Sequence, residues 1–371
     1  MPDLQPFGAL AIPGAKIPGS ERFSAFEHPQ QALYMGQIVN REVVLASRPD
    51  GIPTPGNFEI RQSVMPELGS NELLIRNKFM SVDPYMRGRM RAGKSYAAPF
   101  QEGESMYGGA VGTVVASNNA NWKEGDEVVN SSGWREYTVS TGMGITRVDT
   151  SIAPLQSFLG IAGMPGQTAY FGLLRVGEPK PGETVFVSAA SGAVGGLVCQ
   201  IAKLHGCRVV GSVGSAAKAQ WLRDEAGIDE TIVWRDTDDL SAELGRACPE
   251  GIDVYFENVG GEHLQAALAN MNMYGRVAAC GMISTYNART PQPGPNNLML
   301  IVGNRIRIQG FIVSDFAEDA DQFYADLKKW IDAGQIKWQE TIVHGIEQAP
   351  QAFINLFTGA NHGKMLVQLH D

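Results

Sequence analysis

Cysteine is scarce in this chain of 371 residues. The four cysteines are Cys199, Cys207, Cys248 and Cys280; all lie in the second half, and no two follow a C-x-x-C spacing. We therefore expect no secreted disulfide framework, and reduced thiols in a cytoplasmic protein fit better. Between His28 and Cys199 the chain has neither cysteine nor histidine, so metal centres built from these ligands are not expected there.

Long apolar runs and an excess of basic charge are also missing. No run of about 18 apolar residues occurs, so no membrane span is expected. Residues 1–14, MPDLQPFGALAIPG, lack a basic start and contain prolines, which makes them a poor secretory signal. The 39 Asp and Glu residues outnumber 30 Lys and Arg residues, a balance that argues against general nucleic-acid binding.

Three parts of the chain differ in their pattern. Residues 1–34 carry five prolines and no periodicity, which indicates an irregular N-terminal extension. Residues 35–160 read as short strands and turns, typical of a β-rich, barrel-like domain that residues 335–371 complete. Residues 161–334 alternate buried strands with helices, which predicts a parallel sheet covered on both faces. The predicted fold is therefore α/β: a β-rich domain into which a six-stranded, doubly wound nucleotide fold is inserted.

A glycine-rich segment, residues 184–206, predicts a dinucleotide site. It reads as a strand, a turn and a helix, followed by a second strand. Gly192 would let the backbone approach a pyrophosphate at the helix N-terminus, and Gly195 would let the helix lie close to the sheet. Ala190 holds the first glycine position, a departure from the strict pattern. A turn without a ligand is the alternative, but the order of the elements favours nucleotide binding.

The end of the second strand indicates which nucleotide is bound. NAD sites place an acidic residue here to hold the ribose 2′-hydroxyl, but this chain reads GSVGS at 211–215. Lys218 follows in the next helix. A missing carboxylate beside an ammonium group suits a 2′-phosphate, whereas the alternative for Lys218 is a solvated helix lysine.

Several longer stretches carry a family resemblance. They are LASRPDGIPTPGNF (45–58), SVDPYMRGRM (81–90), GMPGQTAYFGLL (163–174), AASGAVGG (189–196), GIDVYFENVGG (251–261), CGMISTYN (280–287), IRIQGFIV (306–313) and GANHGKMLV (359–367). With them the chain resembles the zinc-independent medium-chain dehydrogenases/reductases, in the branch of leukotriene B4 dehydrogenase, prostaglandin reductase and the alkenal double-bond reductases. Within that branch it is similar to the bacterial NADPH-dependent curcumin reductases. The resemblance covers about residues 40–371.

The resemblance implies a GroES-like catalytic domain with an inserted Rossmann domain, a cytoplasmic homodimer, and NADPH-dependent reduction of a carbon–carbon double bond conjugated to a carbonyl. It also implies which residues bind the cofactor. These are Gly192, Ala193, Val194, Gly195, Lys218, Trp234, Asn258, Cys280, Gly281, Ser284, Tyr286, Phe311, Ile312, Val313 and Asn361. Many relatives have a Tyr on the 2′-phosphate at the position of Trp234, so NADPH preference would depend more on Lys218.

Tyrosines are the candidates for proton transfer and for shaping the substrate pocket. Tyr286 is the first candidate donor, because a phenol stays protonated at neutral pH. Tyr85 and Tyr107 are candidates for lining the pocket. For all three the alternative is a packing role, and the cofactor ribose or a water could supply the proton instead. The arginines at 87, 89 and 91 could attract an acidic substrate, although a solvated basic face is the simpler interpretation.

Two other functions remain open at this point. A quinone oxidoreductase would use the same fold and NADPH, and a non-enzymatic regulator would bind NADPH without turnover. The candidate tyrosines and the intact STYN segment at 284–287 favour an enzyme.

Overall fold

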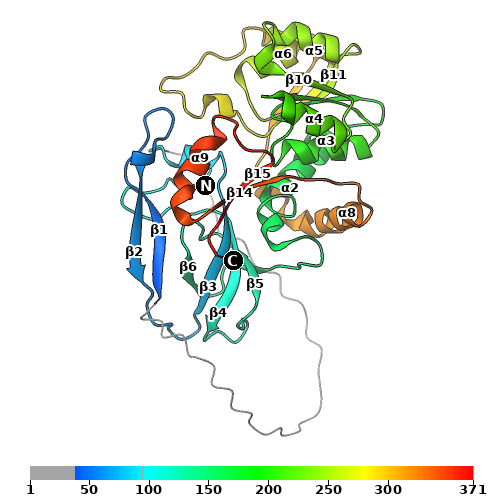
Figure 1. Ribbon diagram of the computed structural model, residues 1–371. Coiled ribbons are helices and arrows are strands. Elements are labelled where there is room, and N and C mark those ends of the chain that lie inside the picture. The colour runs from blue at the N-terminus through cyan, green and yellow to red at the C-terminus, as the bar shows by residue number, and fades with distance from the viewer. Residues whose placement is uncertain (1–37, 94, 371) are drawn as a thin grey trace.

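The computed structural model describes residues 38–93 and 95–370, in which the strands form three sheets (Figure 1). The predicted extension, residues 1–34, lies outside the described residues. The first sheet is an antiparallel pair of β1 (Val39–Leu45) and β2 (Phe58–Val64). Both strands lie beside the second sheet in the lower half of the molecule.

The second sheet joins the two ends of the described chain. Its strand order is β14-β15-β3-β4-β5-β7, and β6 pairs with β3. The strands are β3 (Leu73–Ser81), β4 (Ala110–Ser117), β5 (Glu127–Asn130), β6 (Tyr137–Ser140), β7 (Thr146–Arg147), β14 (Glu340–His344) and β15 (Lys364–Gln368). The strand β15 runs antiparallel to β3 and parallel to β14. The tail of the chain therefore belongs to the same sheet as strands from the first 150 residues.

The third sheet has six strands, all parallel, in the order β10-β9-β8-β11-β12-β13. Its strands are β8 (Thr184–Val187), β9 (Arg208–Val213), β10 (Glu230–Val233), β11 (Ile252–Glu257), β12 (Met271–Ala279) and β13 (Arg307–Gly310). In chain order this is 3-2-1-4-5-6, the order of dinucleotide-binding folds. The predicted α/β class, with a doubly wound sheet beside a β-rich part, is confirmed. The predicted boundaries at 35, 161 and 335 stay predictions.

Helices cover both faces of the six-stranded sheet. They are α2 (Met164–Phe171), α3 (Gly195–Leu204), α4 (Ala216–Asp224), α5 (Leu240–Ala247), α6 (Gly261–Asn270), α7 (Met299–Asn304) and α8 (Ala320–Asp332). Two others, α1 (Met86–Arg89) and α9 (Ala349–Leu356), pack beside the seven-stranded sheet. Successive side chains of a strand point to opposite faces. Val185 and Val187 accordingly join the core formed with α2, α3, α4 and α8, whereas Phe186 joins the core formed with α5 and α6.

One predicted strand ends early, and this shapes the site. The sequence pattern predicts a strand over 275–284, but β12 ends at Ala279. The backbone N–H groups of Cys280 and Gly281 both donate to the carbonyl oxygen of Glu257, at 2.9 and 3.0 Å. Two consecutive donors on one acceptor turn the chain out of the ladder. Residues 280–287 therefore form a loop beyond the sheet edge.

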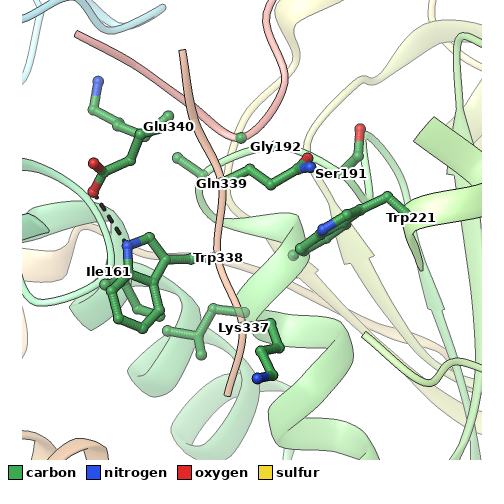
Figure 2. Close-up of a pocket in the computed structure, with 13 residues that line it drawn as sticks. Ile161, Ser191, Gly192, Trp221, Lys337, Trp338, Gln339 and Glu340 are labelled. Atoms are coloured by element: carbon green, nitrogen blue, oxygen red, sulfur yellow. Dashed lines mark hydrogen bonds between the residues drawn. The ribbon is translucent and has the colours of Figure 1, made fainter. Parts of the chain in front are cut away.

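The two larger sheets meet at a short backbone pairing. Gly363, just before β15, forms a parallel bridge with Gly192, and its N–H donates to Ser191 O at 3.2 Å. Figure 2 shows this junction, where the segment carrying Trp338 and Gln339 passes beside the turn of Ser191 and Gly192. Gly363 has a φ of +62°, and a Cβ atom there would overlap the carbonyl oxygen of Gln339.

We expect Gly363→Ala to lower the free energy of unfolding by more than the strain of its positive φ angle alone would. Gly334 is the matched control, because its φ of +66° is similar but a Cβ there would meet no atom within 4 Å. Gly334→Ala should lower the free energy of unfolding by about 1–2 kcal/mol, the strain of a left-handed alanine. Gly363→Ala should lower it by about 1–3 kcal/mol more because of the overlap. Denaturant unfolding measures both; equal losses would contradict the prediction.

Candidate active site

A cavity of about 810 Å³ lies between the six-stranded and the seven-stranded sheets. Segments that follow the carboxyl ends of β8, β9, β11, β12 and β13 line it, as do residues after β3 and before β15. Open α/β sheets bind their ligands at this edge, where the strand order reverses.

The structure brings nearly all of the predicted site residues to this cavity. Those that line it are Tyr85, Gly192, Ala193, Val194, Gly195, Lys218, Trp234, Asn258, Cys280, Gly281, Ser284, Tyr286, Phe311, Ile312, Val313 and Asn361. Tyr107 is not among the lining residues. Its ring packs edge-to-face on Phe100, with the Arg89 guanidinium 5.4 Å from the ring centroid. The roles of these residues in binding and catalysis stay predictions.

The turn between β8 and α3 presents backbone to the cavity. A Cβ at Gly192 would meet only Ala189 O, at 3.2 Å, so its other side is open. A Cβ at Gly195 would lie 2.5 Å from Ala189 O, so only glycine lets α3 begin this close to the turn. The N-terminus of α3, with its positive dipole end, therefore faces the cavity and suits an anion.

Two cations lie together beyond the end of β9. Lys218 Nζ donates to Gly359 O at 2.6 Å, and Arg235 Nη2 donates to Thr358 O at 3.0 Å. Burial and the nearby Arg235 lower the pKa of Lys218. Among the described residues neither cation forms an ion pair with a carboxylate. Two adjacent like charges that bind only neutral carbonyls form a site that an anion would stabilise.

Arg235 was not predicted from the sequence. It directly follows Trp234, and its guanidinium lies 5.2 Å from the centre of the Trp234 ring. Its position could be found only from the fold, because the pairing of β10 with β9 brings residue 235 beside the end of β9. Trp234 also packs edge-to-face on His263, whose ring nitrogen is 2.9 Å from Ser212 Oγ. Burial lowers the pKa of His263 to about 4, so His263 adds no charge here at neutral pH.

A buried carboxylate organises the turn after β11. Glu257 Oε1 accepts hydrogen bonds from the backbone N–H groups of Val259 and Gly260, at 2.6 and 2.9 Å, and from Ser188 Oγ at 3.1 Å. Asn258 Nδ2 donates to Ser188 O at 2.7 Å. Burial raises the pKa of the Glu257 carboxyl. This side chain, missed by the sequence analysis, fixes the segment that carries Asn258.

Tyr286 places its hydroxyl over the bend after β12. The hydroxyl oxygen accepts the Met282 N–H at 3.4 Å and would lie 3.0 Å from a Cβ at Gly281. Within residues 38–93 and 95–370 its own proton has no acceptor, so the hydroxyl can donate to a group in the cavity. Burial raises the pKa of Tyr286, which keeps the phenol protonated at neutral pH.

Two more tyrosines line the same end of the cavity. Burial and then the nearby Asp83 carboxylate raise the pKa of Tyr85. Tyr96, which was not singled out from the sequence, also lines the cavity. Of the three arginines considered above, Arg87 is only 1% exposed and does not belong to a solvated face, whereas Arg91 is exposed.

No three His, Cys, Asp or Glu side chains come together to hold a metal ion within residues 38–93 and 95–370. Over the same ranges, no helix is long and apolar enough to cross a membrane.

We expect Cys280 to react slowly with thiol reagents in the folded protein. Burial, with a contribution from Glu257, raises the pKa of this thiol to about 12. Alkylation needs the thiolate, and its fraction at pH 8 would be about 10⁻⁴, against about a quarter for an ordinary thiol. Mass spectrometry after iodoacetamide treatment should show a rate about 10³-fold lower than in the unfolded chain. The rate should also rise through pH 10, where that of the unfolded chain levels off; equal rates would refute the prediction.

Comparison with known proteins identifies the family. A family model described as "N-terminal domain of oxidoreductase" matches residues 41–148, and one described as "Zinc-binding dehydrogenase" matches residues 193–330. The chain is 42% identical to an NADPH-dependent curcumin reductase of Escherichia coli, over 89% of this chain and 97% of that protein. It is 43% identical to an NADP(+)-dependent 2-alkenal reductase of Nicotiana tabacum, over 90% of this chain and 98% of that protein.

A solved structure agrees with these relatives. The crystal structure of CurA from Vibrio vulnificus in complex with NADPH matches 89% of this chain and 99% of its own, with a TM-score of 0.85 and 43% identity. Both the sequence and the fold are thus shared over nearly the whole of each relative. The chain belongs to the medium-chain dehydrogenase/reductase family, in the branch of the curcumin, alkenal and prostaglandin reductases.

Proposed function

We propose that this protein is an NADPH-dependent ene-reductase, which reduces the carbon–carbon double bond of α,β-unsaturated ketones or aldehydes. The observation that carries the proposal is one cavity lined both by tyrosines and by Lys218 and Arg235, two cations that form no ion pair with a carboxylate among the described residues. The relatives support it, since a curcumin reductase and a 2-alkenal reductase are more than 40% identical to this chain.

The cavity fits NADPH along its length. Lys218 and Arg235 would hold the 2′-phosphate, and the N-terminus of α3 would face the pyrophosphate. No acidic side chain follows β9 at residues 211–215, where NAD sites place one. The bend after β12, with Cys280 and Gly281, and Phe311 to Val313 beyond β13 would border the nicotinamide and its ribose, with Asn258 below and Asn361 reaching over from the tail.

The chemistry then depends on what surrounds the carbonyl of the substrate. Bound NADPH supplies a hydride, which is directed to the β-carbon of the enone. Negative charge grows on the carbonyl oxygen, and a donor placed there stabilises it. Tyr286, protonated and with its O–H free, is the proposed donor, and Tyr85 and Tyr96 shape the pocket around the substrate. Because the charge spreads into an enolate, a neutral hydroxyl is an adequate partner. A proton on the α-carbon, supplied by Tyr286, the cofactor ribose or a water, then completes the saturated carbonyl product.

Two alternative functions predict different results. A quinone oxidoreductase would turn over a quinone faster than an enone, and a regulator would bind NADPH and turn over neither. Solved quinone oxidoreductases share only about a fifth of their residues with this chain, so they show the fold alone. The tyrosines at the carbonyl end favour the reductase.

The assembly and the domain division belong to the same proposal. Residues 35–160 with 335–371 would form the substrate domain, and 161–334 the cofactor domain, supported by the separate sheets.

A homodimer is supported by β13, which is the edge of the six-stranded sheet and exposed along its length, and by Met299 and Val302, which are 80% and 79% exposed on α7. Such an edge pairs readily with a second copy. Four free thiols support a cytoplasmic location.

The first experiment concerns cofactor choice. Replacing Lys218 or Arg235 with alanine should raise the KM for NADPH about 10- to 150-fold, since a charged hydrogen bond to phosphate is lost. The KM for NADH should hardly change. Lys328→Ala is the control, because this helix lysine pairs with Asp332 outside the cavity. Equal use of both cofactors by the wild type would defeat the assignment.

The second experiment concerns the reaction itself. With NADPH deuterated at the nicotinamide C4, deuterium should appear at the β-carbon of a saturated ketone. Deuterium at the carbonyl carbon of an allylic alcohol would refute the proposal. Tyr286→Phe should lower kcat about 10²–10³-fold, the usual effect of removing an oxyanion donor. Tyr137→Phe, which removes a hydroxyl outside the cavity, should leave kcat unchanged.

A further inference from the structure

The loop that carries Tyr286 is held across the cleft by two arginines. Arg91 Nη2 donates to the carbonyl oxygens of Tyr286 and Ala288, at 2.8 and 2.9 Å. Arg87 Nε donates to Asn287 Oδ1 at 2.9 Å. Three consecutive loop residues are therefore each bound by an arginine about 200 positions earlier in the chain.

The arginines come from a rigid base. Arg87 lies in α1, and its neighbours Met86 and Met90 are fully buried in the core beside the seven-stranded sheet. Arg48 Nη1 also donates to Met90 O, at 2.9 Å. Because α1 and Met90 are fixed in this way, Arg87 within the helix and Arg91 just after it hold the loop from a rigid part of the chain.

Arg87 also binds a third segment. Its Nη2 donates to Pro49 O at 3.2 Å and to Gly51 O at 2.8 Å. The segment after Gly51 places Ile52 in the cavity wall. One buried guanidinium thus joins segments that supply Ile52, Tyr85 and Tyr286 to the cavity, using the rigid fork of donors that lysine lacks.

The loop itself forms few other hydrogen bonds with the rest of the described chain. Ile283 and Ser284 donate backbone hydrogen bonds to the turn after β11, at 3.2 and 3.0 Å. Beyond them, the bonds of Tyr286 N–H and Ala288 N–H stay within the loop, to Ile283 O and Thr285 O. Among the described residues, the hydrogen bonds that leave residues 286–288 for distant parts of the chain are those to Arg87 and Arg91.

We infer that Arg87 and Arg91 are positioning residues that hold the 286–288 loop, and with it the Tyr286 hydroxyl, against the substrate end of the cavity. This inference rests on the proposed function for its effect on turnover. The contacts themselves are independent of it. Neither arginine reaches the reacting atoms; each acts through the loop.

The experiment compares three full-length variants by hydrogen exchange and by kinetics. Arg91→Ala removes both carbonyl bonds, and Arg91→Lys keeps a donor. Arg61→Ala is the matched control, since Arg61 is an exposed arginine whose Nη1 donates to the carbonyl of Gly103 away from the cavity. The amides of Tyr286 and Ala288 report loop opening, because their bonds lie within the loop.

In Arg91→Ala the exchange of these two amides should be about tenfold faster, and kcat/KM for an enone about tenfold lower. The KM for NADPH should change little, since the cation pair lies at the other end of the cavity. Arg91→Lys should recover part of both effects, and Arg61→Ala should behave as wild type. A purely structural role would instead lower the unfolding midpoint without shifting these values. Unchanged exchange at 286 and 288 in Arg91→Ala would overturn the inference.

Arg87 is tested through its partner, because Arg87→Ala removes a buried side chain and could prevent folding. Asn287→Ala frees the Nε of Arg87 but keeps its bonds to Pro49 and Gly51. Exchange should increase at 286–288 and stay unchanged at Gly51; an increase at neither place would contradict the role of Arg87. If the wild type reduces no enone, the proposed function fails, while the exchange results still decide whether the arginines hold the loop.

Discussion

The backbone pairing of Gly363 with the turn before α3 is the constraint on which the site depends. It brings the tail, which belongs to the seven-stranded sheet, against the turn that opens the six-stranded sheet to a ligand. The next residue, Lys364, is buried, and its Nζ donates to Val82 O at 2.9 Å and pairs with Asp83 at 3.2 Å. The tail therefore fixes the end of β3 and the turn at Gly192 relative to each other. This link is one of the contacts that hold the two sheets on either side of the cavity, together with a core that contains Val111 and Leu366 of one sheet and Val185 of the other.

The tail also meets the cation pair. Lys218 and Arg235 donate to the carbonyls of residues 359 and 358, which follow the C-terminal end of α9. These carbonyl oxygens are neutral acceptors, so they compensate the two cations only in part. A phosphate carries full charge and would be the stronger partner. The cation pair and the turn at Gly192 are therefore both in contact with the same segment of chain, residues 358–363.

Local pattern was sufficient for the elements and for the turn, but not for contacts between distant residues. The strand runs and the glycine spacing at 192 and 195 are local features, so the parallel sheet and the turn could be predicted. Arg235, Tyr96 and Arg87 could not, because their positions depend on how segments up to about 200 residues apart meet. For Tyr107 the local motif suggested a place in the pocket, but its ring packs against Phe100 and does not line the cavity.

The loop after β12 is held from two sides, and this arrangement accounts for the position of Tyr286. On the sheet side, the backbone of Glu257 accepts both N–H groups of the bend, while its buried carboxylate fixes the neighbouring turn. On the other side, Arg87 of α1 and Arg91, two residues after the end of α1, bind the loop. A hydroxyl that must meet a developing charge gains from such support, because a donor that is already in place needs no reorganisation as the charge forms. The loop thus lies outside both sheets, but Glu257 on one side and Arg87 and Arg91 on the other fix the position of the Tyr286 hydroxyl.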